Sequence, residues 1–224
     1  NGRLKGVFHR MIQTIDGLLP DTDYEIMLVR ANEASETVTF HTEPEPITLN
    51  VRDFGAFGDG AHDDTSAIQA AILCCPKNAR VLISKGTYLV TALFLKSDMI
   101  LELQENAVLA GIYDRARTPI LPGQIEYDNE DGYYNLGSWE GNPIDSFASM
   151  ITGIHVKNVT ICGKGVLDGR ADFENWWSRP KDKIRAWRPR MIFLNHCENI
   201  TVVGVTVQNS PAWNLHPYFS NQIR

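Results

Sequence analysis

The residues MITGIHVKNVTICGKGVLDG (150–169) and MIFLNHCENITVVGVTVQNS (191–210) decide the fold, because they are two copies of one pattern. Identical residues recur at a constant offset of 41, at Met150/Met191, Ile151/Ile192, Asn158/Asn199, Thr160/Thr201, Gly163/Gly204 and Val166/Val207. Asn221 follows Asn199 by 22 residues, which indicates a repeating unit of about 22 residues and a 19-residue insertion between the first pair. A single unit of this size cannot bury its apolar face, so the units must stack.

The same pattern extends toward the N-terminus. Short apolar runs, most of them separated by Gly, Asn, Asp or Ser, recur at VLI (81–83), YLV (88–90), LFL (93–95), MILEL (99–103) and VLA (107–109). Asp98 precedes Asn158 by 60 residues, which fits one unit plus an insertion of 38 at 112–149. Strands at this period, with insertions at one place in the coil, predict an all-β fold over residues 47–224, a parallel β-helix.

One segment has the period of a helix instead. Ile68, Ala71, Ile72 and Cys75 have the i, i+3, i+4, i+7 spacing of a helix with one buried face. We expect this helix to cap the first coil and cover its strand edges. The pair Asp63–Asp64 invites a glycosidase interpretation, but its place before the helix predicts N-capping.

Residues 1–46 differ from the repeat. GLLPDTDY (17–24) is a turn that leads into alternating apolar residues, and a second alternating run ends at Thr42–Glu43. This pattern resembles the later half of a fibronectin type III domain, in which a Leu-x-Pro-x-Thr-x-Tyr corner precedes a strand. Pro44 and Pro46 are typical of a linker. The sequence therefore predicts a partial β-sandwich module in front of the β-helix.

Composition excludes several classes of function. The net charge of −6 argues against general nucleic-acid binding, and no apolar run approaches the roughly 18 residues of a membrane span. Cysteine and histidine lack the spacing of a zinc site, so His196–Cys197 is interpreted as packing and no metal or cofactor is expected. The loop RPKDKIRAWRPR (179–190) carries a local charge of +5, which suits either an anionic ligand or a solvated loop.

The two Asn-x-Thr sequences at 158–160 and 199–201 match glycosylation sites. Their place in the repeat favours another interpretation, a ladder of stacked asparagines at the turns between strands. Asparagine tolerates the left-handed conformation, and stacked amides satisfy one another.

Taken together, these stretches resemble the N-terminal part of a polygalacturonase, glycoside hydrolase family 28 of the pectin-degrading β-helix superfamily. The resemblance covers residues 50–224 and rests on the following stretches: VRDFGAFGDGAHDDTSAIQAAI (51–72), LPGQIEYDN (121–129), ICGKGVLDGR (161–170) and RPRMIFLNHCENITVVGVTVQNSPAW (188–213). The series R-P-x-x-I … N-S-P-x-W-x-x-H is its most specific part. A fibronectin-type module in front is similar to bacterial members that act on chain ends.

The resemblance implies inverting hydrolysis of α-linked galacturonan without a metal. The family's catalytic residues come from Asn-Thr-Asp-Gly and Gly/Gln-Asp-Asp motifs, followed by Gly-His-Gly and Arg-x-Lys, and this series does not occur in the chain. Asp63–Asp64 cannot stand in for it, because it precedes N-S-P-x-W. We therefore expect no catalytic residue here and treat the chain as a fragment, inactive alone, that stops one coil short of the acids.

What the chain is expected to supply is part of the substrate-binding surface. In WNLH (213–216), alternation places Trp213 and Leu215 on one face and Asn214 and His216 on the other. If the first pair packs inward, Asn214 and His216 face outward and can bind a sugar, although His216 before Pro217 equally suits a turn. Trp139 could stack on a sugar or pack on the barrel. Arg188 could pair with a uronate carboxylate or be structural.

Two rival functions stay open at this point: a non-hydrolytic carbohydrate-binding β-helix and a pectate lyase-like enzyme with calcium ligands. The expected partner is a polyanionic pectin polysaccharide or oligosaccharide, with no nucleic acid and no membrane. The residues do not determine the oligomeric state or the compartment, with a secreted or periplasmic location favoured over a cytoplasmic one.

Overall fold

The computed structural model describes residues 6–7, 15, 17–30, 33–124 and 135–224. The chain divides into two compact units, Asn1–Pro46 and Ile47–Arg224, and each is described by itself. Residues 125–129 of the LPGQIEYDN stretch lie outside the described residues. Within the described ranges no helix combines the length and apolar character needed to cross a membrane.

The first unit contains an antiparallel hairpin of β1 (Asp23–Arg30) and β2 (Glu33–His41). The backbone N–H of Leu19 donates to the hydroxyl of Tyr24 at 2.8 Å. A tyrosine hydroxyl bonded to backbone a few residues upstream is typical of the corner of a β-sandwich. The described residues form one hairpin here, so the fibronectin type III-like module stays a prediction.

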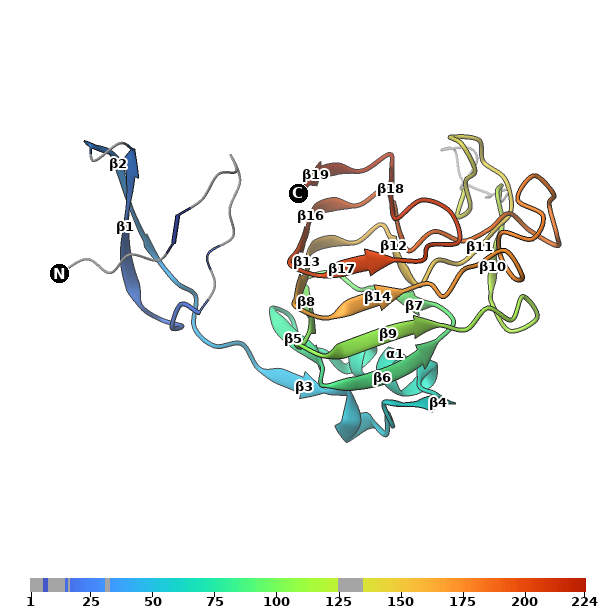
Figure 1. The fold of residues 1–224 in the computed structure, drawn as a ribbon, viewed down its shortest axis with the longest axis horizontal. Helices are drawn as coiled ribbons and strands as arrows, with labels where there is room; N and C mark the ends of the chain where they lie inside the picture. The colour runs from blue at the N-terminus through green and yellow to red at the C-terminus, as the bar shows by residue number, and fades with distance from the viewer. Residues whose placement is uncertain (1–5, 8–14, 16, 31–32, 125–134) are drawn as a thin grey trace. The chain divides into compact units, whose positions relative to one another are not determined.

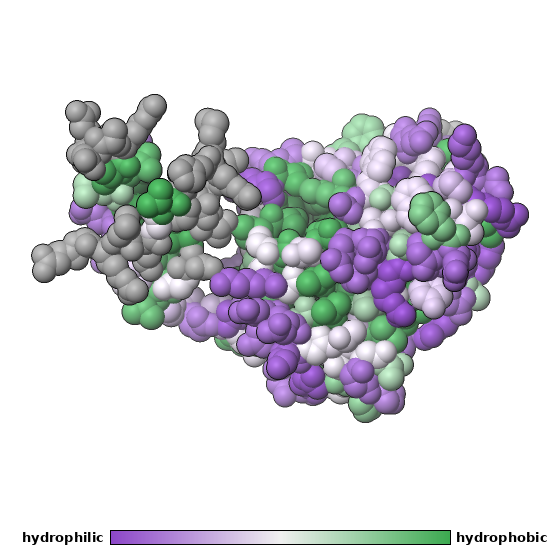
Figure 2. All heavy atoms as spheres, in the orientation of Figure 1, coloured by the Kyte–Doolittle hydropathy of each residue, from purple (hydrophilic) through white to green (hydrophobic). Residues whose placement is uncertain are grey.

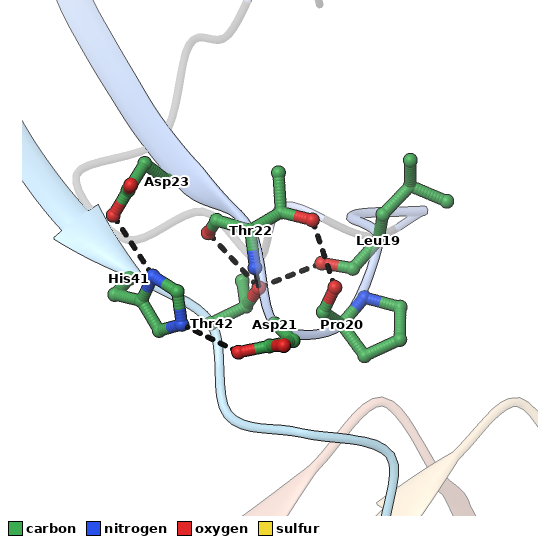
Figure 3. A network of polar contacts seen from close by, with 7 residues as sticks. All are labelled: Leu19, Pro20, Asp21, Thr22, Asp23, His41 and Thr42. Carbon is green, nitrogen blue, oxygen red and sulfur yellow. Dashed lines mark hydrogen bonds and ion pairs between the residues drawn. The ribbon is translucent and has the colours of Figure 1, made fainter.

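A polar network closes the base of this hairpin (Figure 3). The imidazole of His41 lies between Asp21 and Asp23, at 3.0 and 2.8 Å, and these contacts, with Asp23 the stronger, raise the pKa of His41. The hydroxyl of Thr42 contacts the carbonyl oxygen of Leu19 at 2.7 Å. The backbone N–H groups of Thr42 and Asp21 also donate to the carbonyls of Thr22 and Glu43, at 2.9 and 3.1 Å, so side chains and backbone together join the two strand ends.

The second unit is a parallel β-helix, as the repeat predicts (Figure 1). Three parallel sheets run along it. The first sheet has the order β18 (Leu215–Tyr218), β15 (Ile192–Asn195), β12 (Ile151–Ile154), β7 (Leu93–Phe94). The second has β19 (Asn221–Ile223), β16 (Glu198–Val203), β13 (Lys157–Gly163), β8 (Met99–Leu103), β5 (Ala79–Ile83), β3 (Thr48–Asn50). The third has β17 (Thr206–Gln208), β14 (Val166–Asp168), β9 (Ala107–Gly111), β6 (Gly86–Val90), β4 (Asp59–Asp63).

Inward side chains form columns, one residue from each coil. Val81, Leu101 and Ile161 occupy one column in register and are fully buried. Burying such a side chain stabilises the fold by about 1.5–3 kcal/mol. In the last coil Leu215 stacks on Ile192 but stays 38% exposed, against 1% for Ile192. Figure 2 shows a hydrophobic area beside strands β17–β19.

The predicted offset of 41 holds only as far as the turn after β13. Thr160 pairs with Thr201 at this offset, but Val166 pairs with Thr206 and Leu167 with Val207, an offset of 40. Pairing Val166 with Val207 was wrong, because the turn after β16 is one residue shorter. A one-residue slip exchanges inward and outward faces.

The asparagine ladder is confirmed. The amide of Asn199 donates to Asn158 at 2.9 Å, and the amide of Asn158 donates to Asp98 at 2.7 Å. All three have the left-handed backbone, with φ of 54, 54 and 59°. The next rung is Gln222, with φ of 53°, rather than Asn221. Glu198 pairs with Asn221, so this coil has 23 residues instead of the expected 22.

The capping helix is confirmed as α1 (Thr65–Cys74), which follows the short 3₁₀ helix η1 (Val51–Phe54). Its side chains at Ile68, Ala71 and Ile72 are fully buried in the main core. The apolar stripe therefore points into the end of the β-helix, as its spacing requires.

The two aspartates before α1 do different things. Asp64 occupies the N-cap position, but its side chain makes no bond to the helix. It is 1% exposed and accepts the backbone N–H groups of Phe57 and Gly58 at 2.7 and 3.0 Å. Asp63 is exposed and accepts the N–H of Thr65 at 2.9 Å. The capping prediction was wrong for the Asp64 side chain, because its two oxygens accept the loop N–H groups of Phe57 and Gly58 instead of those of the helix.

Both insertions leave the third sheet and return to the first, so they lie at one place in the coil. They run from Gly111 to Ile151 and from Asp168 to Ile192. The first contains the short antiparallel pair β10 (Ile120–Leu121) and β11 (Ser146–Phe147). These loops gather at the far right of Figure 1, and Figure 2 shows a mostly hydrophilic surface there.

Candidate functional site

The outward face of the first sheet is the floor of the candidate site. Thr152, Phe193 and His216 form one outward row in register, and Ile154, Asn195 and Tyr218 form the next. The inserted loops contact this floor: the amide of Asn195 donates to the carbonyl of Asn135 at 2.6 Å. The loops are therefore fixed against the sheet by packing and hydrogen bonds.

Arg188 serves this packing. It is 8% exposed, and its two terminal nitrogens donate to the carbonyls of Pro211 and Pro180 at 2.6 and 3.2 Å. Its guanidinium carbon lies 4.0 Å from the ring centre of Trp177, a cation–π contact. Burial, and then Arg115, lower the pKa of Arg188. The structure gives Arg188 protein acceptors, which favours the structural interpretation.

Arg190 lies two residues further and differs in one respect. It is 3% exposed, and its Nε is buried without a partner, as is the Nε of Arg188. Its two terminal nitrogens, unlike those of Arg188, donate to no protein acceptor in the described ranges. Its guanidinium carbon is 4.8 Å from the ring centre of Trp139 and 5.8 Å from that of Phe193. Burial, and then Arg188, lower its pKa to about 10, while Glu140 opposes the shift. Arg190 is therefore still a cation at neutral pH.

His216 completes the polar part of the site. It is 6% exposed, lies 5.3 Å from Phe193 between ring centres, and its Nδ1 has no partner within the described part of the chain. Burial, and then the charge of Arg190, lower the pKa of His216 to about 4. The imidazole is therefore neutral at pH 7 and adds no second positive charge beside Arg190.

A pocket opens beside Arg190, between two tryptophans. It is lined by Trp139, Glu140, Arg190, Ala212 and Trp213, with about 180 Å³ of empty space including its mouth. The condition that Trp213 packs inward is not met: it is 53% exposed and lies edge-on to His216 at 4.9 Å. Strand β18 begins at Leu215, so the strand alternation does not extend back to Trp213.

The four residues singled out from the sequence do not form one cluster. Trp139 lies in the pocket wall, with Arg188 behind it at 5.4 Å. His216 is held on the other side of Trp213. Asn214 is exposed, and its side chain has no hydrogen-bond partner among the described residues. Their roles in binding remain predictions.

From the sequence, Arg190 was part of the basic loop 179–190 but was not singled out as a site residue. A signal for it existed, because residues 188 and 190 are two apart in an extended Arg-Pro-Arg stretch and period two relates them. Trp187, which stacks on Trp139 at 4.8 Å, was missed as well. Its partner lies 48 residues away in the other insertion, and no local pattern indicates such a contact.

We predict that stability falls as the pH is lowered from 7 to 4.5. The folded pKa of His216 is depressed, so below 6.5 the unfolded chain binds a proton that the folded chain excludes. This loss amounts to about 2 kcal/mol. Denaturant unfolding at both pH values measures it, with His216→Phe as the reference that lacks the titrating group. Equal pH dependence in the two proteins would contradict the assignment.

The chemistry of the pocket is cationic and aromatic. Across the described ranges, no three His, Cys, Asp or Glu side chains lie close enough together to hold a metal ion. The pocket instead presents one guanidinium, the carboxylate of Glu140 and two indole rings. Such a set suits an anionic ligand with an apolar face.

The protein is thus a right-handed parallel β-helix whose inserted loops form a cationic, aromatic pocket. The chain belongs to the family Rhamnogalacturonase A/epimerase, pectate lyase-like, which it matches over residues 48–216. The resemblance to polygalacturonases that the sequence predicted is thereby confirmed.

Individual proteins similar to the chain support the same family. The chain is 35% identical over 217 residues to the exo-poly-alpha-D-galacturonosidase of Dickeya chrysanthemi, which covers 91% of the chain and 34% of the relative. It is similar to the structure of the Yersinia enterocolitica family 28 exopolygalacturonase, with a TM-score of 0.73 and 28% identity over 93% of the chain and 44% of that structure. The chain spans about a third of the length of the curated relatives it matches.

A shorter match points elsewhere. Over 75 residues the chain is 48% identical to the plasmin and fibronectin-binding protein A of Streptococcus pneumoniae, covering 31% of the chain and 10% of that protein.

Proposed function

We propose that the chain forms part of a polygalacturonase-type glycoside hydrolase, which cleaves α-linked galacturonic acid in pectin with inversion in the intact protein. One observation carries this proposal: the family's fold here bears a pocket with an unpaired arginine between two tryptophans. Trp139, Asn214 and His216 are assigned to substrate binding, together with the previously missed Trp213. Arg188 holds the loops in place behind them.

The chain alone is proposed to bind this substrate without cleaving it. Inverting hydrolysis needs one carboxylic acid to protonate the leaving oxygen and a second carboxylate to activate water. The pocket contains a single carboxylate, Glu140. Two catalytic carboxylates must therefore come from residues other than those that line this pocket.

We predict that the purified chain binds a galacturonate oligomer, releases no reducing sugar from it, and loses about tenfold in affinity on Trp139→Ala. A tenfold loss corresponds to about 1.4 kcal/mol, a moderate value for one aromatic contact. Calorimetric titration with tetragalacturonate and a reducing-sugar assay on polygalacturonate measure the two parts.

Phe173→Ala is the matched control, because Phe173 is 85% exposed and does not line the pocket. It should bind like the unchanged chain. Measurable sugar release would contradict the proposal that the chain alone binds this substrate without cleaving it. Equal affinities for Trp139→Ala and Phe173→Ala would remove Trp139 from the site.

The second candidate is a non-hydrolytic binding β-helix. The local similarity to a plasmin and fibronectin-binding protein favours it. A chain that binds plasmin or fibronectin but no galacturonate oligomer would support this candidate and contradict the first. Release of an unsaturated uronate product that depends on calcium would instead support the lyase-like alternative.

A further inference from the structure

We infer that Arg190 is the residue that makes this pocket specific for an acidic sugar, by binding the carboxylate of one uronic acid unit. The inference rests on the proposed function and deepens it, since it assigns the choice between acidic and neutral sugars to one side chain. From the sequence, the basic loop 179–190 as a whole suited an anionic ligand, without a role for Arg190 in particular.

The positive charge of Arg190 has no matching negative charge nearby. Arg190 is 3% exposed, and no carboxylate within the described part of the chain lies within ion-pair distance of it. A buried charge is costly unless an opposite charge or hydrogen-bond acceptors compensate it. Arg188 has this compensation from two backbone carbonyls, whereas Arg190 does not. An anionic ligand would supply the negative charge and the hydrogen-bond acceptors that Arg190 lacks.

Arg190 is held rigidly in place. The backbone N–H of Arg190 donates to the hydroxyl of Ser149 at 3.0 Å, and both residues are buried. The guanidinium contacts the rings of Trp139 and Phe193. A fixed planar fork can meet the two oxygens of a carboxylate with two parallel hydrogen bonds. Little side-chain entropy then remains to be lost on binding.

Two aromatic side chains lie in the pocket wall beside Arg190. Trp139 and Trp213 line it together with Arg190, so an apolar face of a sugar ring can contact indole while its carboxylate meets the guanidinium.

Glu140 limits the attraction. It lines the same pocket and raises the pKa of Arg190, but it lies beyond ion-pair distance from the guanidinium. A ligand carboxylate therefore meets a cation with a weak competitor. Removing the charge of Glu140 is expected to strengthen binding of an acidic sugar.

The test compares two ligands on the complete chain: trigalacturonate and the same trimer with its carboxyl groups reduced to alcohols. The unchanged chain should prefer the acidic trimer by tenfold or more. Arg190→Gln should remove most of this preference, by about tenfold to a hundredfold, while it leaves affinity for the reduced trimer nearly unchanged. Arg190→Lys keeps the charge without the fork and should retain part of the preference.

Arg170→Gln is the matched control, because Arg170 is exposed and contacts Tyr113 outside the pocket. It should keep the full preference, and Glu140→Gln should increase it. Melting curves of all variants show whether each is folded. If Arg190→Gln fails to fold, Arg190→Lys and the two ligands on the unchanged chain still decide the matter.

The outcomes separate the two proposals. If the unchanged chain binds neither trimer, both the proposed function and the role of Arg190 are wrong. If it binds both trimers equally, or if Arg190→Gln keeps the full preference for the acidic trimer, only the role of Arg190 is wrong.

Discussion

Gly163→Ala is expected to lower the free energy of unfolding by about 4 kcal/mol, the largest effect that we predict for a single substitution. Gly163 has a φ of 112°, and a Cβ atom at this position would lie 2.0 Å from the carbonyl oxygen of Leu103. That oxygen belongs to the backbone of the preceding coil and accepts the N–H groups of Lys164 and Gly165 at 3.0 and 3.1 Å. Relief of the clash must therefore separate two coils.

The strain has two sources. A non-glycine residue at this φ is itself unfavourable by about 1–3 kcal/mol, and displacing a backbone carbonyl disturbs the ladder between β8 and β13. The melting temperature should fall by about 10 °C for a chain of this size. Thermal unfolding followed by circular dichroism measures it.

Gly141→Ala is the matched control. Gly141 also has a positive φ, 82°, but a Cβ there would meet no atom within 4 Å. It should lose only the conformational part, about 1 kcal/mol. If both variants lost the same stability, contact between the coils would not be what requires glycine at position 163.

Asp64→Ala is expected to cost about 3 kcal/mol, the second largest effect. The buried carboxylate accepts two backbone N–H groups from the loop at Phe57 and Gly58. Alanine would leave both donors without a partner, and each such loss costs about 1–3 kcal/mol. Urea unfolding at neutral pH measures the change.

Asp63→Ala is the neighbouring control. Asp63 accepts the N–H and hydroxyl of Thr65 and forms an ion pair with Arg117, but it is exposed. Exposed contacts of this kind contribute about 1 kcal/mol or less. A larger loss for Asp63→Ala than for Asp64→Ala would show that helix capping, rather than loop anchoring, is the main role of this pair.

The repeat predicted the architecture because it reports a requirement that every coil shares. Inward positions must be apolar and turns must admit left-handed residues, so the pattern survives along the chain. The ladder from Asp98 through Asn158 to Asn199 followed from this requirement. Its next rung was misplaced by one residue, because counting between asparagines cannot detect a coil of 23 residues.

The site was predicted less well, for a physical reason that Arg188 and Arg190 illustrate. Both are buried arginines from one basic loop, and their sequence surroundings are almost the same. Backbone carbonyls of Pro211 and Pro180 accept from the two terminal nitrogens of Arg188, and no equivalent acceptor meets those of Arg190 among the described residues, while the Nε of each arginine is buried without a partner. Which of the two is free to bind an anion depends on where distant backbone comes to lie.

The sequence by itself therefore determined the stacked coils, the capping helix, the place of the insertions and the family, since these depend on periodicity and on motifs within single segments. Tertiary structure alone decided the partners of Asp64, the exposure of Trp213 and the unmatched charge of Arg190. These depend on contacts between residues that lie far apart along the chain. The residue pattern within one segment does not predict such contacts.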